Sequence, residues 1–170
     1  MKIHFKIVFV VILMGYLPID QPFALSNPSK PHRIVAMYNH AERPLSNFTL
    51  ESTPWSKITH LMYANATINL TDFSLSFPDT MWNALLYCNS LRQGHNVKLL
   101  ISLGGPGNST FFKAGTSNIT QITTFTRNCI TLIKALSLDG INISWHWPAD
   151  TSESEAYLRL IRSMKTVTDS

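Results

Sequence analysis

The chain has 170 residues, of which 45% are hydrophobic and only 14% charged, so it holds enough apolar material for a folded core and is not of the disordered class. Its length suits one domain or part of one. The formal net charge is +4 without a Lys/Arg cluster, which argues against a nucleic-acid-binding protein. The cysteine spacing does not fit a zinc site, and we expect neither a metal nor a cofactor.

Residues 1–26 predict a secretory signal peptide. Lys2 and Lys6 form a basic segment before an uninterrupted apolar run over residues 7–17, and small residues up to Ser26 fit a cleavage site. The alternative is a membrane anchor, but a spanning helix needs roughly 20 apolar residues, and Pro18 ends this run early. We therefore expect a secreted protein without a membrane span.

In a secreted protein, Asn-x-Ser/Thr triplets are acceptors for N-glycosylation, and their density in this chain is typical of a glycoprotein. We expect glycosylation at Asn47, Asn69, Asn108 and Asn118. Asn142 lies in a predicted buried strand and should be bare, and the same reason counts against Asn65.

The chain has two cysteines, Cys88 and Cys129, on two predicted helices that should be neighbours. An oxidising compartment permits a disulfide between them. The alternative is that both are buried thiols that pack as small hydrophobic side chains. The sequence leaves both possibilities open, because it does not give the Cα separation that decides between them.

Short apolar runs predict four β-strands. They cover residues 33–38, 58–64, 97–103 and the segment after Asp139-Gly140. Near-continuous apolar runs are typical of a parallel sheet buried on both faces. The polar segments 39–54 and 65–78 are expected to be loops, and the Gly/Pro-rich residues 104–107 end the third strand.

Three helices are predicted between and after these strands. The first covers residues 79–93, with Asp79 as N-cap and Gly94 beyond its end. The second is the clearest, because one helical face carries Ile122, Phe125, Cys129, Leu132, Ile133 and Leu136. The third opens with a capping box formed by Ser152 and Glu155. This alternation implies parallel strands joined by right-handed crossovers, so the predicted fold class is α/β.

Three stretches together resemble the strand motifs of the family 18 glycoside hydrolases, the chitinases. Residues 59–64 are similar to the second-strand pattern, and Ser102-Leu103-Gly104-Gly105 is similar to the third-strand motif Ser-x-Gly-Gly. Residues 139–146 align with the fourth-strand signature Asp-Gly-x-Asp-x-Asp-x-Glu, and Trp145 and Pro148 match the ending that often follows it. The resemblance covers residues 33–170.

This resemblance implies a (β/α)8 TIM barrel, whose sites lie at the carboxyl ends of the strands. A full barrel needs roughly 250 residues, so we expect a partial, C-terminally truncated barrel of about four βα units over residues 33–170. Such a half-barrel exposes two strand edges and the inner face of its sheet. Either chains associate through these surfaces or the fragment folds poorly, and we expect self-association.

The same resemblance implies that the catalytic positions are degenerate. In the family, a Glu protonates the glycosidic oxygen, and an Asp two residues earlier orients the N-acetyl group of the substrate, which attacks the anomeric carbon. Here the Glu position is His146, the orienting Asp position is Ser144, and the Asp before it is Asn142. Without those carboxylates we expect no hydrolase activity.

The aromatic residues Tyr38, Trp145 and Trp147 lie where a sugar ring could still stack. We therefore expect lectin-like binding of chitin, chito-oligosaccharides or other glycans that contain N-acetylglucosamine. For these aromatics, and for Trp145 above all, ordinary packing in the barrel is the alternative. Two other functions stay open: a non-binding secreted interaction or signalling protein (or a truncated isoform), and a very weak chitin hydrolase that uses His146 as its acid.

Overall fold

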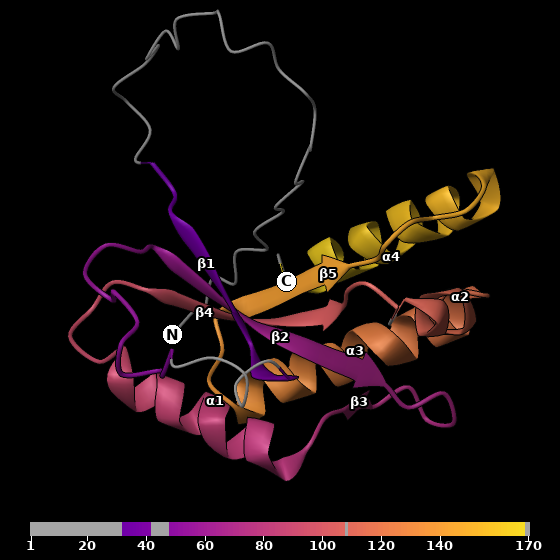
Figure 1. Cartoon of the computed structure of the whole chain (residues 1–170). Helices are drawn as coiled ribbons and strands as arrows, with labels where there is room; N and C mark the ends of the chain where they lie inside the picture. Colours follow the sequence, from indigo (N-terminus) through magenta and orange to yellow (C-terminus); the bar gives the residue numbers. More distant parts are fainter. Residues whose placement is uncertain (1–31, 42–47, 108, 169–170) are drawn as a thin grey trace, which may run out of the picture.

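The computed structural model describes residues 32–41, 48–107 and 109–168. Its elements, in chain order, are β1 (Val35–Asn39), β2 (His60–Ile68), β3 (Leu75–Ser76), α1 (Asp79–Leu91), β4 (Lys98–Gly104), α2 (Thr110–Gly115), α3 (Ile119–Ala135), β5 (Gly140–Ser144) and α4 (Thr151–Thr168) (Figure 1). This alternation of strands and helices confirms the predicted α/β class.

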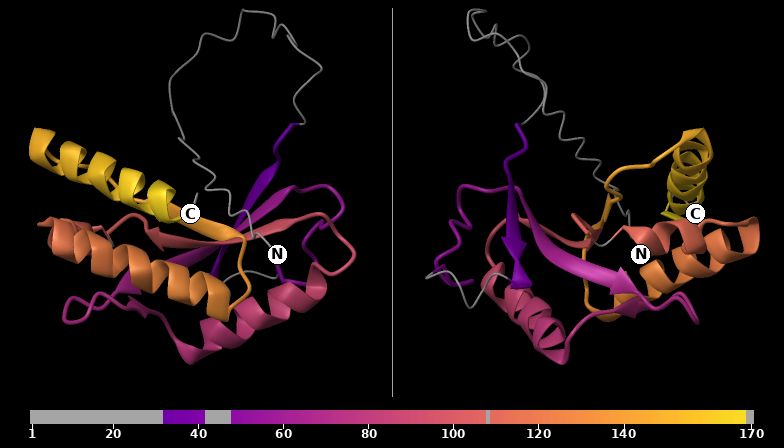
Figure 2. Two further views of the ribbon diagram at one scale, coloured as in Figure 1. Left: turned by 180° about the vertical axis from the view of Figure 1, so that it is seen from behind. Right: turned by 45° about the vertical axis from the view of Figure 1, so that its right-hand side comes forward.

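Four of the strands form a parallel sheet in the order β1-β2-β4-β5. β3 pairs antiparallel with the end of β2 and lies outside this order. Because all four strands point the same way, their carboxyl ends meet at one edge, as in part of a TIM barrel (Figures 1 and 2). The partial-barrel prediction is thereby confirmed for the described residues.

The main core lies between the sheet and helices α1, α3 and α4. Successive side chains of a strand point to opposite faces, so Leu61 and Tyr63 of β2 join Leu99 and Ile101 of β4 in this core. The helices contribute buried side chains such as Leu85, Phe125 and Leu160. On the other face, Met62 and Leu100 form a smaller cluster with Val35.

Two parts of the secondary-structure prediction were wrong. The expected loop at 65–78 instead contains the last four residues of β2 and the short strand β3. β2 continues because Ala66 and Ile68 are buried in the core while Thr67 between them points the other way. Helix α2 was not predicted, and its Phe111 and Phe112 are buried.

The helix ends also differ from the prediction. Pro78, not Asp79, occupies the N-cap of α1. The cap of α4 is formed by Asp150, whose Oδ1 accepts the Glu153 N–H at 2.9 Å, while Glu153 Oε2 accepts the Ala149 N–H at 2.9 Å. The pair resembles a capping box two residues before the predicted Ser152–Glu155 box, except that Glu153 accepts from Ala149, the residue before the N-cap, and not from the N-cap itself.

Of the two alternatives for the cysteines, the disulfide is wrong, because Cys88 and Cys129 are both free and buried. Each packs in the main core as a small hydrophobic side chain. Burial raises the pKa of Cys88 to about 12, and burial also raises the pKa of Cys129. Both side chains are therefore protonated thiols at neutral pH.

Several sequence predictions fall outside the described residues. They concern the signal peptide of residues 1–26 and the glycosylation sites Asn47 and Asn108. Within the ranges that are described, no helix is long and apolar enough to cross a bilayer.

Candidate functional site

The candidate site lies at the carboxyl ends of β4 and β5. The two strands pair residue by residue as far as Gly104 and Ser144. Gly104 has a φ of +88°, and a Cβ added there would stand 2.6 Å from the Ser144 carbonyl oxygen and 2.7 Å from the Phe112 ring. Only glycine fits this approach. The Ser-x-Gly-Gly motif thus brings the turn after β4 directly against the end of β5.

Asn142 is buried and faces a hydroxyl instead of solvent. Its side-chain nitrogen donates to Ser102 Oγ at 2.9 Å, and the two residues are register partners in β4 and β5. The glycosylation triplet at Asn142 therefore has its amide inside the sheet. Asn142, the first of the degenerate signature positions, therefore forms a neutral hydrogen-bonded pair with Ser102.

Ser144 and His146 form the second polar pair. Ser144 Oγ and His146 Nε2 share a hydrogen bond of 3.0 Å, which follows from the i, i+2 spacing at the end of an extended strand. The backbone N–H of His146 donates to Ser109 Oγ at 2.9 Å. The sequence reasoning missed Ser109, which the turn after β4 brings back to β5.

The two tryptophans of this region have opposite environments. Trp145 is 9% exposed and stacks on Phe112 with ring centroids 5.1 Å apart and an interplanar angle of 12°. The Tyr157 ring meets it edge-on. Trp147 is 81% exposed and contacts the His146 ring at a centroid distance of 5.1 Å. Trp145 is thus a core side chain, whereas Trp147 offers an open aromatic face.

Tyr38 is also packed, at the opposite edge of the sheet. It is 6% exposed, and its ring lies 5.1 Å from Tyr63 and 6.2 Å from Phe48 between centroids. Since β1 and β5 are separated by β2 and β4, about 14 Å of sheet lies between them at the usual strand spacing. The structure therefore does not bring Tyr38 and Trp147 together.

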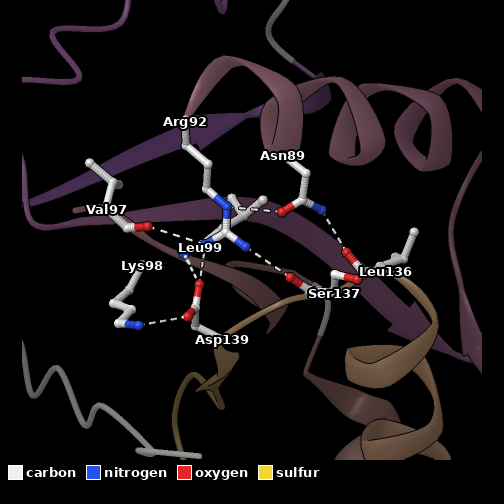
Figure 3. Close-up of polar contacts among 8 residues, drawn as sticks. All are labelled: Asn89, Arg92, Val97, Lys98, Leu99, Leu136, Ser137 and Asp139. Atoms are coloured by element: carbon white, nitrogen blue, oxygen red, sulfur yellow. Dashed lines mark hydrogen bonds and ion pairs between the residues drawn. The ribbon is translucent and has the colours of Figure 1, made fainter. Parts of the chain in front are cut away.

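Asp139, the one carboxylate of the signature that is kept, lies at the other end of β5. Its Oδ1 accepts from Lys98 Nζ and its Oδ2 from the Leu99 N–H, both at 2.9 Å, and Arg92 donates to Oδ2 as well (Figure 3). Arg92 also donates to the carbonyl oxygens of Val97 and Ser137. This cluster joins the end of α1 to the starts of β4 and β5.

The electrostatics of the cluster fit a structural role. Burial by itself would raise the pKa of Asp139, but the Leu99 N–H, Lys98 and Arg92 outweigh it and hold that pKa below its ordinary value. A cavity of about 510 Å³ lies beside the cluster and is lined in part by Arg92, Lys98 and Asp139. It is at the amino end of the sheet, away from the candidate site.

Among the residues that the structure covers, no group of three or more His, Cys, Asp or Glu side chains could hold a metal ion. The polar groups at the candidate site are an amide, three serine hydroxyls and an imidazole. The Asn142 and Ser102 groups are buried and bind each other, whereas the partly buried Ser144 and His146 can donate and accept hydrogen bonds to a sugar. Together with an exposed indole, they suit recognition of a polar ligand with an apolar ring face.

The sequence profile described as glycosyl hydrolases family 18 matches residues 33–169. Chitinase 1 of Aphanocladium album is 28% identical over 144 residues, which is 73% of this chain and 34% of that protein. The chain thus spans about a third of the length of this curated relative.

Two solved structures illustrate the likeness of the fold. A plant class V chitinase mutant from Cycas revoluta, in complex with (GlcNAc)3, superimposes with a TM-score of 0.72 and 22% identity, over 80% of this chain and 41% of that one. The chitinase-like agglutinin from Robinia pseudoacacia gives a TM-score of 0.69 and 18% identity, over 78% of this chain and 40% of that one.

Proposed function

Because this chain belongs to family 18 of the glycosyl hydrolases, we propose that it is a secreted protein that binds chitin or other N-acetylglucosamine-containing glycans without hydrolysing them. The observation that carries this proposal is the chemistry of Asn142, Ser144 and His146. They present an amide, a hydroxyl and an imidazole where the family signature has carboxylates.

Hydrolysis would need both a proton donor and a group that stabilises positive charge. A general acid contributes about 10²–10⁴-fold to such a reaction, and electrostatic stabilisation often contributes more. His146 is hydrogen-bonded to Ser144, and a neutral hydroxyl cannot balance the charge of an oxazolinium intermediate. These features support binding without turnover.

The carboxylates that follow in the chain are already occupied. Asp150 caps α4 through the Glu153 N–H. Glu153 accepts the Ala149 N–H and pairs with Lys113 at 3.2 Å. If Asp150 or Glu153 took the role of a missing catalytic carboxylate, the start of α4 would lose the hydrogen bonds that cap it.

Binding is supported by Trp147 and by two proteins of the same fold. An indole that is 81% exposed offers a flat apolar surface on which a sugar ring can stack. The Cycas revoluta chitinase holds (GlcNAc)3 in its crystal, and the Robinia pseudoacacia protein is a chitinase-like agglutinin. A chitinase and a chitinase-like agglutinin thus share this fold.

The test is retention on chitin beads, with elution by chitotriose. We expect retention of the wild-type chain, and weaker retention of Trp147→Ala. Trp82→Ala is the matched control, because Trp82 is a partly exposed indole on α1 that stacks on Phe77 instead. A folded wild-type chain that passes through the beads, or retention that chitotriose does not compete, would contradict the proposal.

The bead experiment, together with a turnover assay, also separates the two other functions. A non-binding secreted interaction protein would give a folded chain with no retention. A weak hydrolase would release the fluorophore from a fluorogenic chitobioside, and this turnover would disappear in His146→Ala. We expect no turnover above the buffer control in either the wild type or this variant.

A further inference from the structure

The hydroxyl of Ser109 connects the two strand ends that border the proposed glycan site. Ser109 immediately precedes α2 and is 9% exposed. Its Oγ lies 3.2 Å from the Gly105 carbonyl oxygen and 3.3 Å from that of Ser144. A hydroxyl has a single proton but two lone pairs, so it donates to these carbonyls and still accepts the His146 N–H at 2.9 Å.

This contact begins where the sheet ladder ends. Just past the ends of β4 and β5, the Gly105 N–H still donates a backbone hydrogen bond to the Ser144 carbonyl oxygen at 2.8 Å. His146 lies beyond the end of β5, and within the described part of the chain its N–H has Ser109 Oγ as its acceptor. Ser109 thus extends the ordered backbone two residues past the end of β5.

The same short helix holds the residue before His146. Phe112 of α2 stacks on Trp145. The α2 segment therefore fixes Trp145 through its ring and His146 through its backbone N–H. Trp147, the exposed indole, follows directly.

We propose that Ser109 is a positioning residue for Trp147: it fixes the backbone at His146 so that the indole is held in place before a glycan binds. This inference rests on the proposed function. A ring that is already ordered in the free protein loses less conformational freedom on binding. Loss of the Ser109 hydroxyl should then weaken binding although Ser109 itself does not face the glycan.

The test compares Ser109→Ala with Thr116→Val. Thr116 lies at the other end of α2, is 1% exposed, and its Oγ1 donates to the Phe112 carbonyl oxygen at 2.7 Å. Both substitutions remove one buried hydroxyl, but only the first removes a contact of His146. We expect comparable losses of thermal stability from the two.

The distinguishing readouts are binding and amide exchange. In Ser109→Ala, we expect the chitotriose Kd to rise roughly three- to tenfold, which corresponds to one hydrogen bond. The His146 amide proton should exchange faster with solvent, and the NMR signal of the Trp147 indole N–H should report a more mobile ring. In Thr116→Val all three should match the wild type.

The inference is overturned if Ser109→Ala keeps wild-type exchange at His146, or if Thr116→Val weakens binding equally. If the wild type does not bind chitotriose, the proposed function fails, and the exchange and indole measurements on the free protein decide the inference alone. If Ser109→Ala does not fold, Ser109→Cys supplies a weaker acceptor at the same place. It should accelerate the exchange of the His146 amide, and wild-type exchange in it overturns the inference.

Discussion

Replacing Asp139 by Asn should destabilise the fold more than any change to an exposed ion pair. The carboxylate accepts hydrogen bonds from Lys98, Arg92 and the Leu99 N–H, and the Asp139 side chain is 24% exposed. Asn keeps one acceptor oxygen but loses the charge and turns an amide group toward a cation. Hydrogen bonds to charged groups are worth about 1.5–3 kcal/mol, so the free energy of unfolding should fall by about 2–3 kcal/mol at pH 7.

The assay is urea unfolding of the wild type and Asp139→Asn, with Glu155→Gln as control. Glu155 pairs with Arg159 at 3.7 Å with both side chains well exposed, so its loss should cost less than about 0.5 kcal/mol. A midpoint change in Asp139→Asn no larger than that of the control would refute the structural role of the cluster.

The same cluster makes a pH prediction. The pKa of Asp139 is lower in the folded chain than its ordinary value of about 3.9. Its charge therefore stabilises the fold above that ordinary value, and this stabilisation is lost as the pH falls through the lower, folded-state pKa. The difference between the wild type and Asp139→Asn should persist from pH 7 to about pH 5 and shrink below pH 4. A constant difference down to pH 2 would contradict this assignment.

Three further predictions concern other parts of the chain. Gly104→Ala should lower the free energy of unfolding by about 2–4 kcal/mol, because its Cβ would meet the Ser144 carbonyl oxygen. At Gly107 an added Cβ would meet no atom within 4 Å, so Gly107→Ala should cost about 1 kcal/mol, and equal urea midpoints for the two variants would contradict this reasoning. When the chain passes through a secretory pathway, enzymatic deglycosylation should lower its mass, because Asn69 and Asn118 are exposed. The mass difference should be smaller in Asn69→Gln and in Asn118→Gln, and a mass that neither substitution changes would contradict glycosylation at these sites. Within the described sheet, no strand pairs with the outer edges of β1 and β5, so the 170-residue chain should self-associate, and light scattering that shows a folded monomer would exclude this.

Periodicity and composition carried the prediction of most of the fold. Helix α3 was predictable because its buried side chains recur at helical spacing, and its cap is the Asn118 side chain, which accepts the Gln121 N–H. β4 was predictable from its near-continuous apolar run, which only Ser102 interrupts between Leu99 and Leu103. The continuation of β2 past Ala64 was missed, because the polar residues Asn65 and Thr67 alternate with Ala66 and Ile68 and resemble a loop.

The site was predictable only as a set of positions. The motif correctly directs attention to the end of β5, but it does not tell a stacked core indole from an exposed one. That difference depends on Phe112, which reaches Trp145 from α2, an element that the sequence did not reveal. The role of Ser109 was hidden for the same reason, since its partner His146 is 37 residues away in the chain.

The two unpaired cysteines have a practical consequence for how the protein can be made. Since Cys88 and Cys129 are buried and protonated, the described fold needs no oxidant and no disulfide exchange to reach its native state. The chain should therefore fold equally well in a reducing cytoplasm and in an oxidising compartment. Every variant discussed above can therefore be produced in bacteria without added redox partners, except Asn69→Gln and Asn118→Gln, which need a host that glycosylates the chain.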